Sequence, residues 1–232
     1  MSRRHPRPTH RPEQLAIVWQ AASVLLGYPD ERQRADLGVV RPAAGTLPAD
    51  LGAPLLRVMD GLGTRALDEL QETYVETFDN RRRTNLFLTY FAHGDTRQRG
   101  AALLRFKQTY LRSGVLLGES ELPDHLCVVL EYAATVDEEL GWELLLDHRA
   151  GLELLRIGLS EEASLWAGAV EAVCATLPPL KGEEREAIRR LAADGPPAEE
   201  VGLTPYGTPA FDPALAPRPI DLPMPALRGA ER

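Results

Sequence analysis

Apolar residues recur at helical spacing through most of the chain. The first run places an apolar residue at every third or fourth position, namely Leu15, Val18, Trp19, Ala22, Leu25 and Leu26. This period aligns them on one face of an α-helix. Pro12 suits the first turn of that helix, and Gly27 with Pro29 predicts its end.

Four later stretches repeat this spacing, and their apolar rows are 67/70/74/78, 103/106/110, 126/130/133/136 and 165/169/173. We predict that Pro123 opens the helix carrying Leu126 and Leu130. Strict two-residue alternation is absent and β-branched residues are sparse, which argues against strands. The pattern therefore predicts an all-α fold, a single-domain bundle of about seven to ten helices with short connections.

The two ends of the chain differ from this helical middle. Residues 1–12 contain four Arg and three Pro, and we predict a flexible, disordered basic arm. Nine Pro fall between Pro196 and Pro225, and such a stretch cannot sustain a helix. We therefore predict a helical domain over residues 13–193 and an extended Pro-rich tail over residues 194–232.

Composition limits the possible functions of the 232-residue chain. Its formal net charge of -8 argues against nucleic-acid binding, which needs a basic excess. Two cysteines, Cys127 and Cys174, make neither a disulfide framework nor a four-ligand zinc site, and they fit a reducing compartment. No apolar run reaches the roughly 18 residues that a membrane span needs. We expect a cytoplasmic protein with no stable membrane insertion.

An export signal is the alternative to a cytoplasmic location. Arg3 and Arg4 precede the apolar run at 15–26, which is the order found in twin-arginine signals. Three prolines and an acid separate the two parts, and no small-residue cleavage site follows. The export reading would require cleavage near Gly27.

Charge is segregated in the middle of the chain. Residues 79–112 hold eight Lys or Arg and two acids, whereas residues 113–147 hold nine acids and no Lys or Arg. Two solvated helix faces would explain this pattern. A bipolar surface that orients a charged partner segment would explain it as well. Within the basic part, Arg81 to Arg83, followed by Arg97 and Arg99, form a basic cluster around the turn residues 93–95. A solvated loop between helices would explain the cluster, and so would a contact with an acidic partner or a phosphate.

Motifs of enzymes and of metal sites are missing. The chain has no phosphate-binding loop, no Gly-x-Ser-x-Gly turn and no His-Glu-x-x-His pair. Its five histidines are scattered, and both cysteines lie on apolar stretches, where a plain core thiol is the simpler reading. We expect no catalysis, no metal and no cofactor.

The sequence Glu-Leu-Pro-Asp-His-Leu at 121–126 is the densest group of polar candidates. Pro123 at a helix start would put Asp124 in the first turn, where a carboxylate meets the positive end of the helix dipole. This structural role alone explains Asp124. His125 and Glu131 are six positions apart, so they share no metal-binding face. A hydrolase using His125 would also need a nucleophile and an oxyanion donor.

Six motifs in this order and spacing resemble those of a known family. They include Tyr-Val-Glu-Thr-Phe-Asp at 74–79 and Glu-Leu-Pro-Asp-His-Leu at 121–126, with further matches at 25–30, 86–91, 93–100 and 130–132. The chain resembles the NarJ-type nitrate reductase assembly chaperones, within the TorD/DMSO-reductase maturation chaperone family. The resemblance covers roughly residues 14–177.

The resemblance implies an all-helical, non-catalytic protein that binds the apo form of a molybdoenzyme. For NarJ-type members the implied client is the α subunit of respiratory nitrate reductase, recognised through its N-terminal segment. The implied role is to permit molybdenum cofactor insertion and then leave the finished enzyme. Molybdenum cofactor biosynthesis proteins are possible further partners. Alternatives are a helical adaptor, or a maturation chaperone for another molybdoenzyme.

The resemblance places Asp124, His125 and Glu131 in the client-binding region. A groove for an amphipathic client helix needs an apolar floor and a charged rim. Acidic rim candidates are Glu119, Glu121, Asp124 and Glu131. Apolar or neighbouring candidates are Pro123, Leu126, Leu130, Tyr74 and Phe78, with Phe106 and Tyr110. Such apolar stripes are more often core than groove.

Overall fold

The computed structural model describes residues 6, 8–94, 96–118 and 121–194, all of which belong to one compact unit. Half of the basic arm predicted over residues 1–12 and almost all of the tail predicted over residues 194–232 lie outside the described residues. The last described helix ends at Asp194, one residue beyond the predicted domain boundary.

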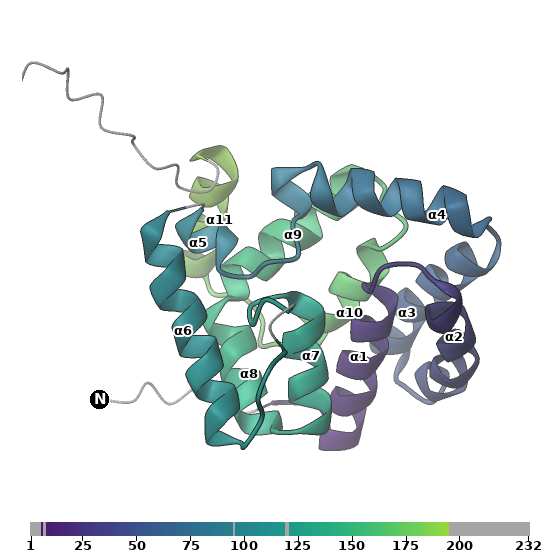
Figure 1. Ribbon diagram of the computed structural model, residues 1–232, viewed down its shortest axis with the longest axis horizontal. Helices are drawn as coiled ribbons and strands as arrows, with labels where there is room; N and C mark the ends of the chain where they lie inside the picture. Colours follow the sequence, from purple (N-terminus) through teal and green to yellow (C-terminus); the bar gives the residue numbers. More distant parts are fainter. Residues whose placement is uncertain (1–5, 7, 95, 119–120, 195–232) are drawn as a thin grey trace, which may run out of the picture. The chain divides into compact units, whose positions relative to one another are not determined.

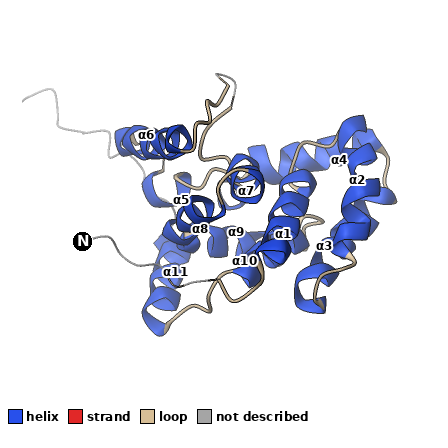
Figure 2. Cartoon of the chain, turned by 90° about the horizontal axis from the view of Figure 1, so that it is seen from below, coloured by secondary structure: helices blue, strands red, loops and turns tan. Residues whose placement is uncertain are grey.

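The described residues form eleven α-helices (Figure 1). Their bounds are α1 (Pro12–Leu25), α2 (Glu31–Ala44), α3 (Ala49–Gly63), α4 (Leu67–Tyr74), α5 (Tyr90–His93), α6 (Arg97–Arg112), α7 (Leu126–Thr135), α8 (Glu138–Asp147), α9 (Arg149–Glu161), α10 (Ala167–Thr176) and α11 (Gly182–Asp194). A π-helical turn (Val75–Asp79) extends α4, and a 3-10 turn (Arg82–Thr84) follows it. No strand occurs in this part of the chain (Figure 2).

The predicted all-α fold is confirmed, but seven to ten helices was too few. The four residues of α5 are too short to show a helical period in the sequence. A single residue, His148, separates α8 from α9, so the apolar pattern runs on through the break. None of the helices among the described residues is long and apolar enough to span a membrane.

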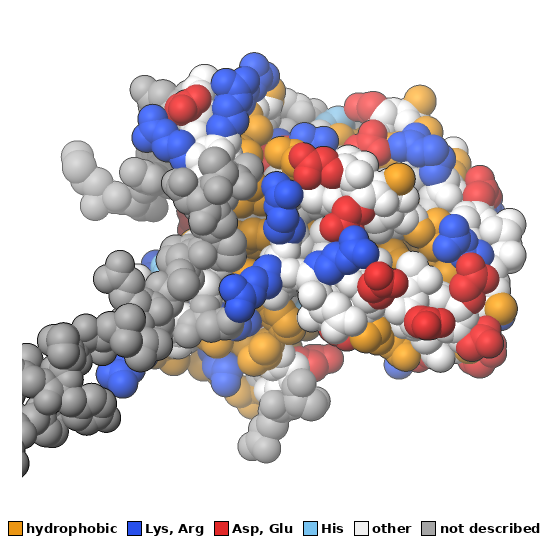
Figure 3. Space-filling model, turned by 90° about the horizontal axis from the view of Figure 1, so that it is seen from above, with side chains coloured by type: hydrophobic (Ala, Val, Ile, Leu, Met, Phe, Trp, Pro, Cys, Tyr) orange, Lys and Arg blue, Asp and Glu red, His pale blue; other side chains and the backbone are white. Residues whose placement is uncertain are grey.

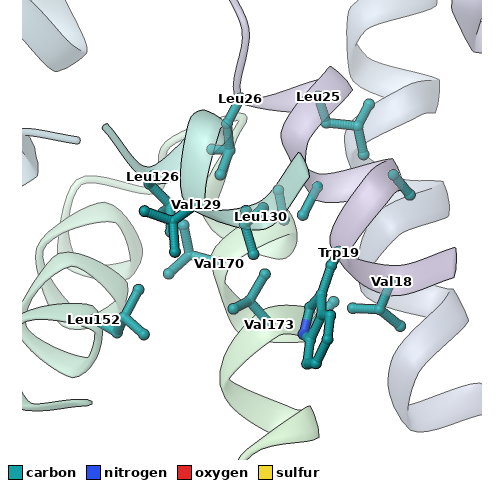
Figure 4. Packing of buried hydrophobic residues seen from close by; sticks show 14 of the residues in the cluster. Val18, Trp19, Leu25, Leu26, Leu126, Val129, Leu130, Leu152, Val170 and Val173 are labelled. Carbon is teal, nitrogen blue, oxygen red and sulfur yellow. The ribbon is translucent and has the colours of Figure 1, made fainter. Parts of the chain in front are cut away.

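Helix α1 lies at the centre of the packing, where it contacts α7, α10, α2 and α3. Trp19 of α1 meets Leu130 of α7 and Val173 of α10 in a fully buried cluster, and Val18 is buried on the other side of Trp19 (Figure 4). Burying each such side chain contributes roughly 1.5–3 kcal/mol. The indole Nε1 of Trp19 also donates to Thr176 Oγ1 at 3.2 Å, which satisfies its polar atom inside the core.

The ends of α1 agree with the sequence prediction. Pro12 occupies the first helical position, and the helix closes at Leu25, before Gly27. The side-chain amide of Gln33 donates to the carbonyls of Val24 at 3.0 Å and Gly27 at 2.9 Å. These bonds supply side-chain donors to carbonyl groups at the helix end, where the regular helical pattern stops.

The described residues of the N-terminal arm contact the helical unit at two points. Trp142 Nε1 in α8 donates to the carbonyl of Pro6 at 2.9 Å. His10 Nε2 lies 3.3 Å from the carbonyl of Ala175 in α10. The arm therefore runs past α8 and α10 before α1 begins.

Candidate functional site

Two loops far apart in the sequence are joined just before α7. Phe87 and His125 form an isolated antiparallel bridge. Leu88 N donates to the Asp124 carbonyl at 3.0 Å, and Leu126 N donates to the Leu86 carbonyl at 2.8 Å. These backbone bonds fix where the chain enters α7.

Asp124 is fully buried at this junction. Its Oδ2 accepts hydrogen bonds from the backbone N–H and the hydroxyl of Thr89. Arg99 Nη2 lies 3.7 Å from the same oxygen. A carboxylate without water needs such partners, since an isolated buried charge is very costly.

This environment corrects the prediction for Asp124. Helix α7 begins at Leu126 with His125 as its N-cap, so Asp124 precedes the helix instead of occupying its first turn. The bridge to residues 86–88 holds His125 extended after a turn at Pro123 and Asp124, so the helix starts later than predicted. Pro123 likewise lies before the helix, and its carbonyl accepts a bond of 2.6 Å from the Tyr110 hydroxyl. Asp124 is therefore a buried support, not part of an exposed acidic rim.

His125 is half-buried beside the same loops. Its ring packs edge-on against the Phe87 ring, with centroids 5.2 Å apart. The Arg99 guanidinium lies over the Phe87 ring, 5.3 Å from the centroid of that ring. Burial lowers the pKa of His125, although Asp124 and Glu121 act in the opposite direction. A neutral imidazole at neutral pH follows.

A small groove opens along α7, next to this junction. Its volume is about 290 Å³. We call this hollow the α7 groove. It is lined by Tyr110, Val115, Leu117, Glu121, Val128, Glu131, Tyr132, Thr135 and Val136. Both carboxylates in this set, Glu121 and Glu131, are exposed. The groove thus has a largely apolar lining with two acids at its border.

Hydrogen bonds hold the far end of the α7 groove. The Tyr132 hydroxyl and Ser113 Oγ lie 2.7 Å apart, and Ser113 Oγ donates to Asp137 Oδ2 at 3.0 Å. Burial raises the pKa of Tyr132, so its hydroxyl keeps the proton that it donates to Ser113. The end of α6 is thereby tied to both α7 and the start of α8.

Exposed apolar side chains border the α7 groove. Leu116 is 84% exposed although it lies between two lining residues in the sequence. Leu122 and the lining residue Val136 are also exposed. Apolar surface gathered beside a groove is typical of a site that another molecule covers.

Only part of the predicted site set faces this groove. Glu121 and Glu131 line it, whereas Leu126 and Leu130 are fully buried in the core. Tyr74 and Phe78 are buried against Trp166, and the Tyr74 hydroxyl donates to the Leu26 carbonyl at 2.8 Å. The core reading therefore holds for these apolar residues. Glu119 lies outside the described residues.

The sequence did not single out Val115, Leu117 and Val128 of the groove, or Thr89 as the partner of Asp124. Val115 and Leu117 belong to a connection without periodicity, so no pattern distinguishes them. Arg99 lies within the 93–100 motif, which was the only available signal for its pairing with Asp124.

The Arg81–Arg83 cluster has intramolecular partners. Arg81 pairs with Glu76 and Glu162, and Arg83 pairs with Glu161. Basic and acidic side chains likewise alternate over the face seen in Figure 3. This arrangement favours a solvated, internally paired surface over a basic docking patch.

Neither cysteine has the low thiol pKa that a reactive cysteine needs. Burial raises the pKa of Cys127 and of Cys174 to about 12, so both thiols stay protonated. Within the described ranges, no three His, Cys, Asp or Glu side chains gather as metal ligands would.

Residues 45–172 match the model of a family described as the nitrate reductase delta subunit. This match covers more than half of the chain and includes the α7 groove. The chain belongs to this family. The resemblance inferred from the six motifs is thereby confirmed.

Relatives of this delta subunit family member carry chaperone names. The NarJ molybdenum cofactor assembly chaperone of Bacillus subtilis is 35% identical over 166 residues, which are 69% of this chain and 88% of that protein. Escherichia coli NarJ is 33% identical over 148 residues, 62% of this chain and 63% of NarJ. Both names describe proteins that assist the assembly of the molybdenum cofactor into nitrate reductase.

Two further matches extend the comparison. The nitrate reductase-like protein NarX of Mycobacterium tuberculosis is 44% identical over 162 residues, but the chain spans only 24% of its length. A redox enzyme maturation protein from Archaeoglobus fulgidus shares the fold with a TM-score of 0.52 and 25% identity. That match covers 75% of this chain and 98% of the other.

Proposed function

We propose that this family member is a system-specific cytoplasmic chaperone for the apo α subunit of respiratory nitrate reductase. It binds the N-terminal segment of that subunit, permits molybdenum cofactor insertion and leaves the finished enzyme. The observation that carries the proposal is the α7 groove, an apolar hollow with Glu121 and Glu131 at its border, in a chain whose relatives are named nitrate reductase chaperones.

The α7 groove suits a basic, amphipathic peptide. Apolar side chains of the peptide would cover Val115, Leu117 and Val128, while its Lys or Arg residues would meet Glu121 and Glu131. Opposite charges at an exposed border mainly govern orientation and association rate. The volume of about 290 Å³ is at the lower end of small-molecule sites, which favours a few side chains of a segment over a cofactor.

Asp124 and His125 do not line the α7 groove, but they hold the chain beside it. The bridge between Phe87 and His125, with the bonds from Thr89 to Asp124, sets the course of the chain between Glu121 and α7. The position of Glu121 relative to Glu131 depends on that course. We therefore assign Asp124 and His125 a positioning role.

A calorimetric titration with the N-terminal peptide of the α subunit tests the proposal. Glu121→Gln with Glu131→Gln should weaken binding on the order of tenfold, because two charge contacts are lost without a change of shape. Glu72→Gln, an exposed acid on α4, is the matched control and should bind like the wild type. Equal affinity of the double variant and the control would contradict the assignment.

The family description leaves one competing role, because it names a subunit and not a chaperone. A permanent subunit would co-purify with mature, cofactor-loaded reductase in equal amounts. A chaperone should be recovered with the apo α subunit and lost from the loaded enzyme. Quantifying the protein in both preparations decides between the two roles.

A further inference from the structure

Helix α6 has an open outer face at the edge of the described unit, where Figures 1 and 2 both place the helix. Leu104 and Leu111 lie on this face two helical turns apart, about 10.5 Å along the axis, and they are 55% and 53% exposed. Leu116, in the connection just after the helix, is exposed as well. None of these leucines lines the α7 groove. The described part of the chain leaves this apolar row uncovered.

Basic side chains flank the apolar row on both sides. At 100° per residue, Lys107 lies about 60° from Leu104 around the helix axis in one direction. Arg112 and Arg105 lie about 80–100° from Leu104 in the other direction. All three bases are exposed, and α6 contains five basic residues and no acid. The outer face is therefore apolar along its centre and positive along both edges.

The three flanking bases have no charged partner within the described part of the chain. Arg105, Lys107 and Arg112 take part in no ion pair there. The acids of α8 that line the neighbouring hollow, Glu143 and Asp147, do not pair with them either. Their positive charges are thus available to another molecule.

We propose that the outer face of α6 binds the surface of an anionic lipid bilayer. Leu104, Leu111 and Leu116 enter the boundary between headgroups and acyl chains, and the three bases contact lipid phosphates on both sides of the row. The long stems of Lys and Arg keep their charges at the headgroup level while the leucines lie deeper. The helix lies on the bilayer and does not span it. This contact needs no client, so it stands apart from the proposed function.

Other occupants fit this face less well. A layer of lipid phosphates reaches both edges of a convex helix at once. An acidic helix of a partner protein would need carboxylates on both sides of its own apolar row. A second copy would bring the same bases together across a two-fold contact, where like charges repel.

The charge of the whole chain selects this orientation. With a formal net charge of -8, most of the protein surface is repelled by anionic lipid. Each Lys or Arg near such a surface strengthens binding roughly fivefold, so three bases together give a gain on the order of a hundredfold. We expect reversible binding that weakens as salt screens these charges.

Co-sedimentation of the full-length protein with lipid vesicles tests the proposal. Vesicles of equal parts phosphatidylglycerol and phosphatidylcholine should bind the protein, whereas pure phosphatidylcholine vesicles should bind it weakly or not at all. The triple variant Arg105→Gln, Lys107→Gln, Arg112→Gln should lower the partition coefficient by about tenfold or more. Glycerol phosphate should not displace the protein from the vesicles, because it lacks the acyl chains that the leucines contact.

A matched variant controls for net charge. Arg32→Gln, Lys181→Gln, Arg185→Gln removes two Arg and one Lys at exposed positions outside α6. It should bind anionic vesicles nearly as the wild type does. The circular dichroism of both triple variants should equal that of the wild type, since exposed side chains are changed.

The apolar row is tested separately from the charges. Leu104→Ser with Leu111→Ser keeps every base and should lower the partition coefficient on the order of tenfold, because two leucines no longer leave water. Val39→Ser, at an exposed apolar position on α2, should have little effect.

A fluorescent label shows which face meets the lipid. An environment-sensitive fluorophore on Gln108→Cys, an exposed position beside the apolar row, should shift to shorter wavelength on anionic vesicles. The same label on Val39→Cys should not shift. Cys127 and Cys174 stay unlabelled at neutral pH, because burial raises the pKa of both thiols to about 12.

Several outcomes would overturn the inference. These are equal binding to neutral and anionic vesicles, equal loss in the two triple variants, or an unshifted label at Gln108→Cys. Displacement by glycerol phosphate would indicate a site for free phosphate instead. Binding of a poly-glutamate peptide by a protein that ignores the vesicles would assign the face to an acidic protein segment. Failure of the proposed function is separate, since it appears in the lipid-free titration of the N-terminal peptide.

Discussion

The guanidinium of Arg99 and the carboxylate of Asp124 form an ion pair across the loop junction, with Nη2 3.7 Å from Oδ2, and the acid is fully buried. Thr89 supplies the remaining bonds to that oxygen. A single carboxylate therefore holds together the start of α6, the loop before α5 and the chain entering α7. Its loss should affect the stability of the fold as well as binding.

We expect Asp124→Asn to lower the free energy of unfolding by about 1–3 kcal/mol, because Arg99 loses its charged partner beside a buried amide. Urea denaturation measures this change. Asp79→Asn, at an exposed position, is the control and should shift stability by less than about 0.5 kcal/mol. Equal stability of the two variants would show that the buried pair contributes little.

Acid should destabilise the fold through His125 and His148. Burial lowers both folded-state pKa values below the ordinary 6.5, so the unfolded chain binds more protons than the folded chain once the pH falls below about 6.5. The contribution is fully present above pH 6.5 and is lost as the pH falls towards the folded-state pKa values. The slope is at most about 1.4 kcal/mol per pH unit for each histidine.

Urea midpoints at pH 7.5 and pH 5.5 check this expectation. His148→Gln should reduce the difference between the two pH values, because one of the two titrating groups is removed. A difference that is unchanged in both His148→Gln and His125→Gln would assign the acid sensitivity to other groups.

Helices α3 and α10 approach closely at Gly168. A methyl group there would lie 2.4 Å from the Pro54 carbonyl oxygen, and this backbone atom cannot rotate away. We expect Gly168→Ala to destabilise the protein by about 1–3 kcal/mol. Gly38→Ala in α2, where nothing lies within 4 Å, should instead stabilise by about 0.4–1 kcal/mol. Thermal unfolding of both variants tests the helix packing directly.

Salt should weaken binding of the N-terminal client peptide. Glu121 and Glu131 are exposed, so their attraction to basic residues is screened as the Debye length falls from about 10 Å at 0.1 M salt to about 3 Å at 1 M. The Glu121→Gln, Glu131→Gln variant should show a much smaller salt dependence. Affinity that rises with salt in both proteins would mean that apolar contacts dominate.

Local patterns were sufficient for the helices but not for the site. The limits of α1 follow from Pro12, Gly27 and the apolar row between them, and the structure agrees. The start of α7 could not be predicted, because Leu88 and Thr89 hydrogen-bond to Asp124 from at least 35 residues earlier in the chain. A pairing of that kind leaves no periodic trace in the sequence.

The candidate site shows the same division between local and distant information. Glu121 and Glu131 were predicted and line the α7 groove, since an acid on the polar face of a helix or in a loop is normally exposed. Tyr74 and Phe78 were predicted as well, but Trp166 covers them. Which apolar residues remain accessible is decided by the packing of other helices, which the motif alone does not contain.

The hydrogen bond between Trp142 and the Pro6 carbonyl has a practical consequence for assay design. The five residues before Pro6 can extend about 18 Å at most. An affinity tag attached ahead of Met1 would therefore begin no more than about 18 Å from the point where Pro6 contacts α8. A bulky tag at this end would therefore lie close to a contact that joins the arm to the helical unit, so purification handles belong at the opposite terminus.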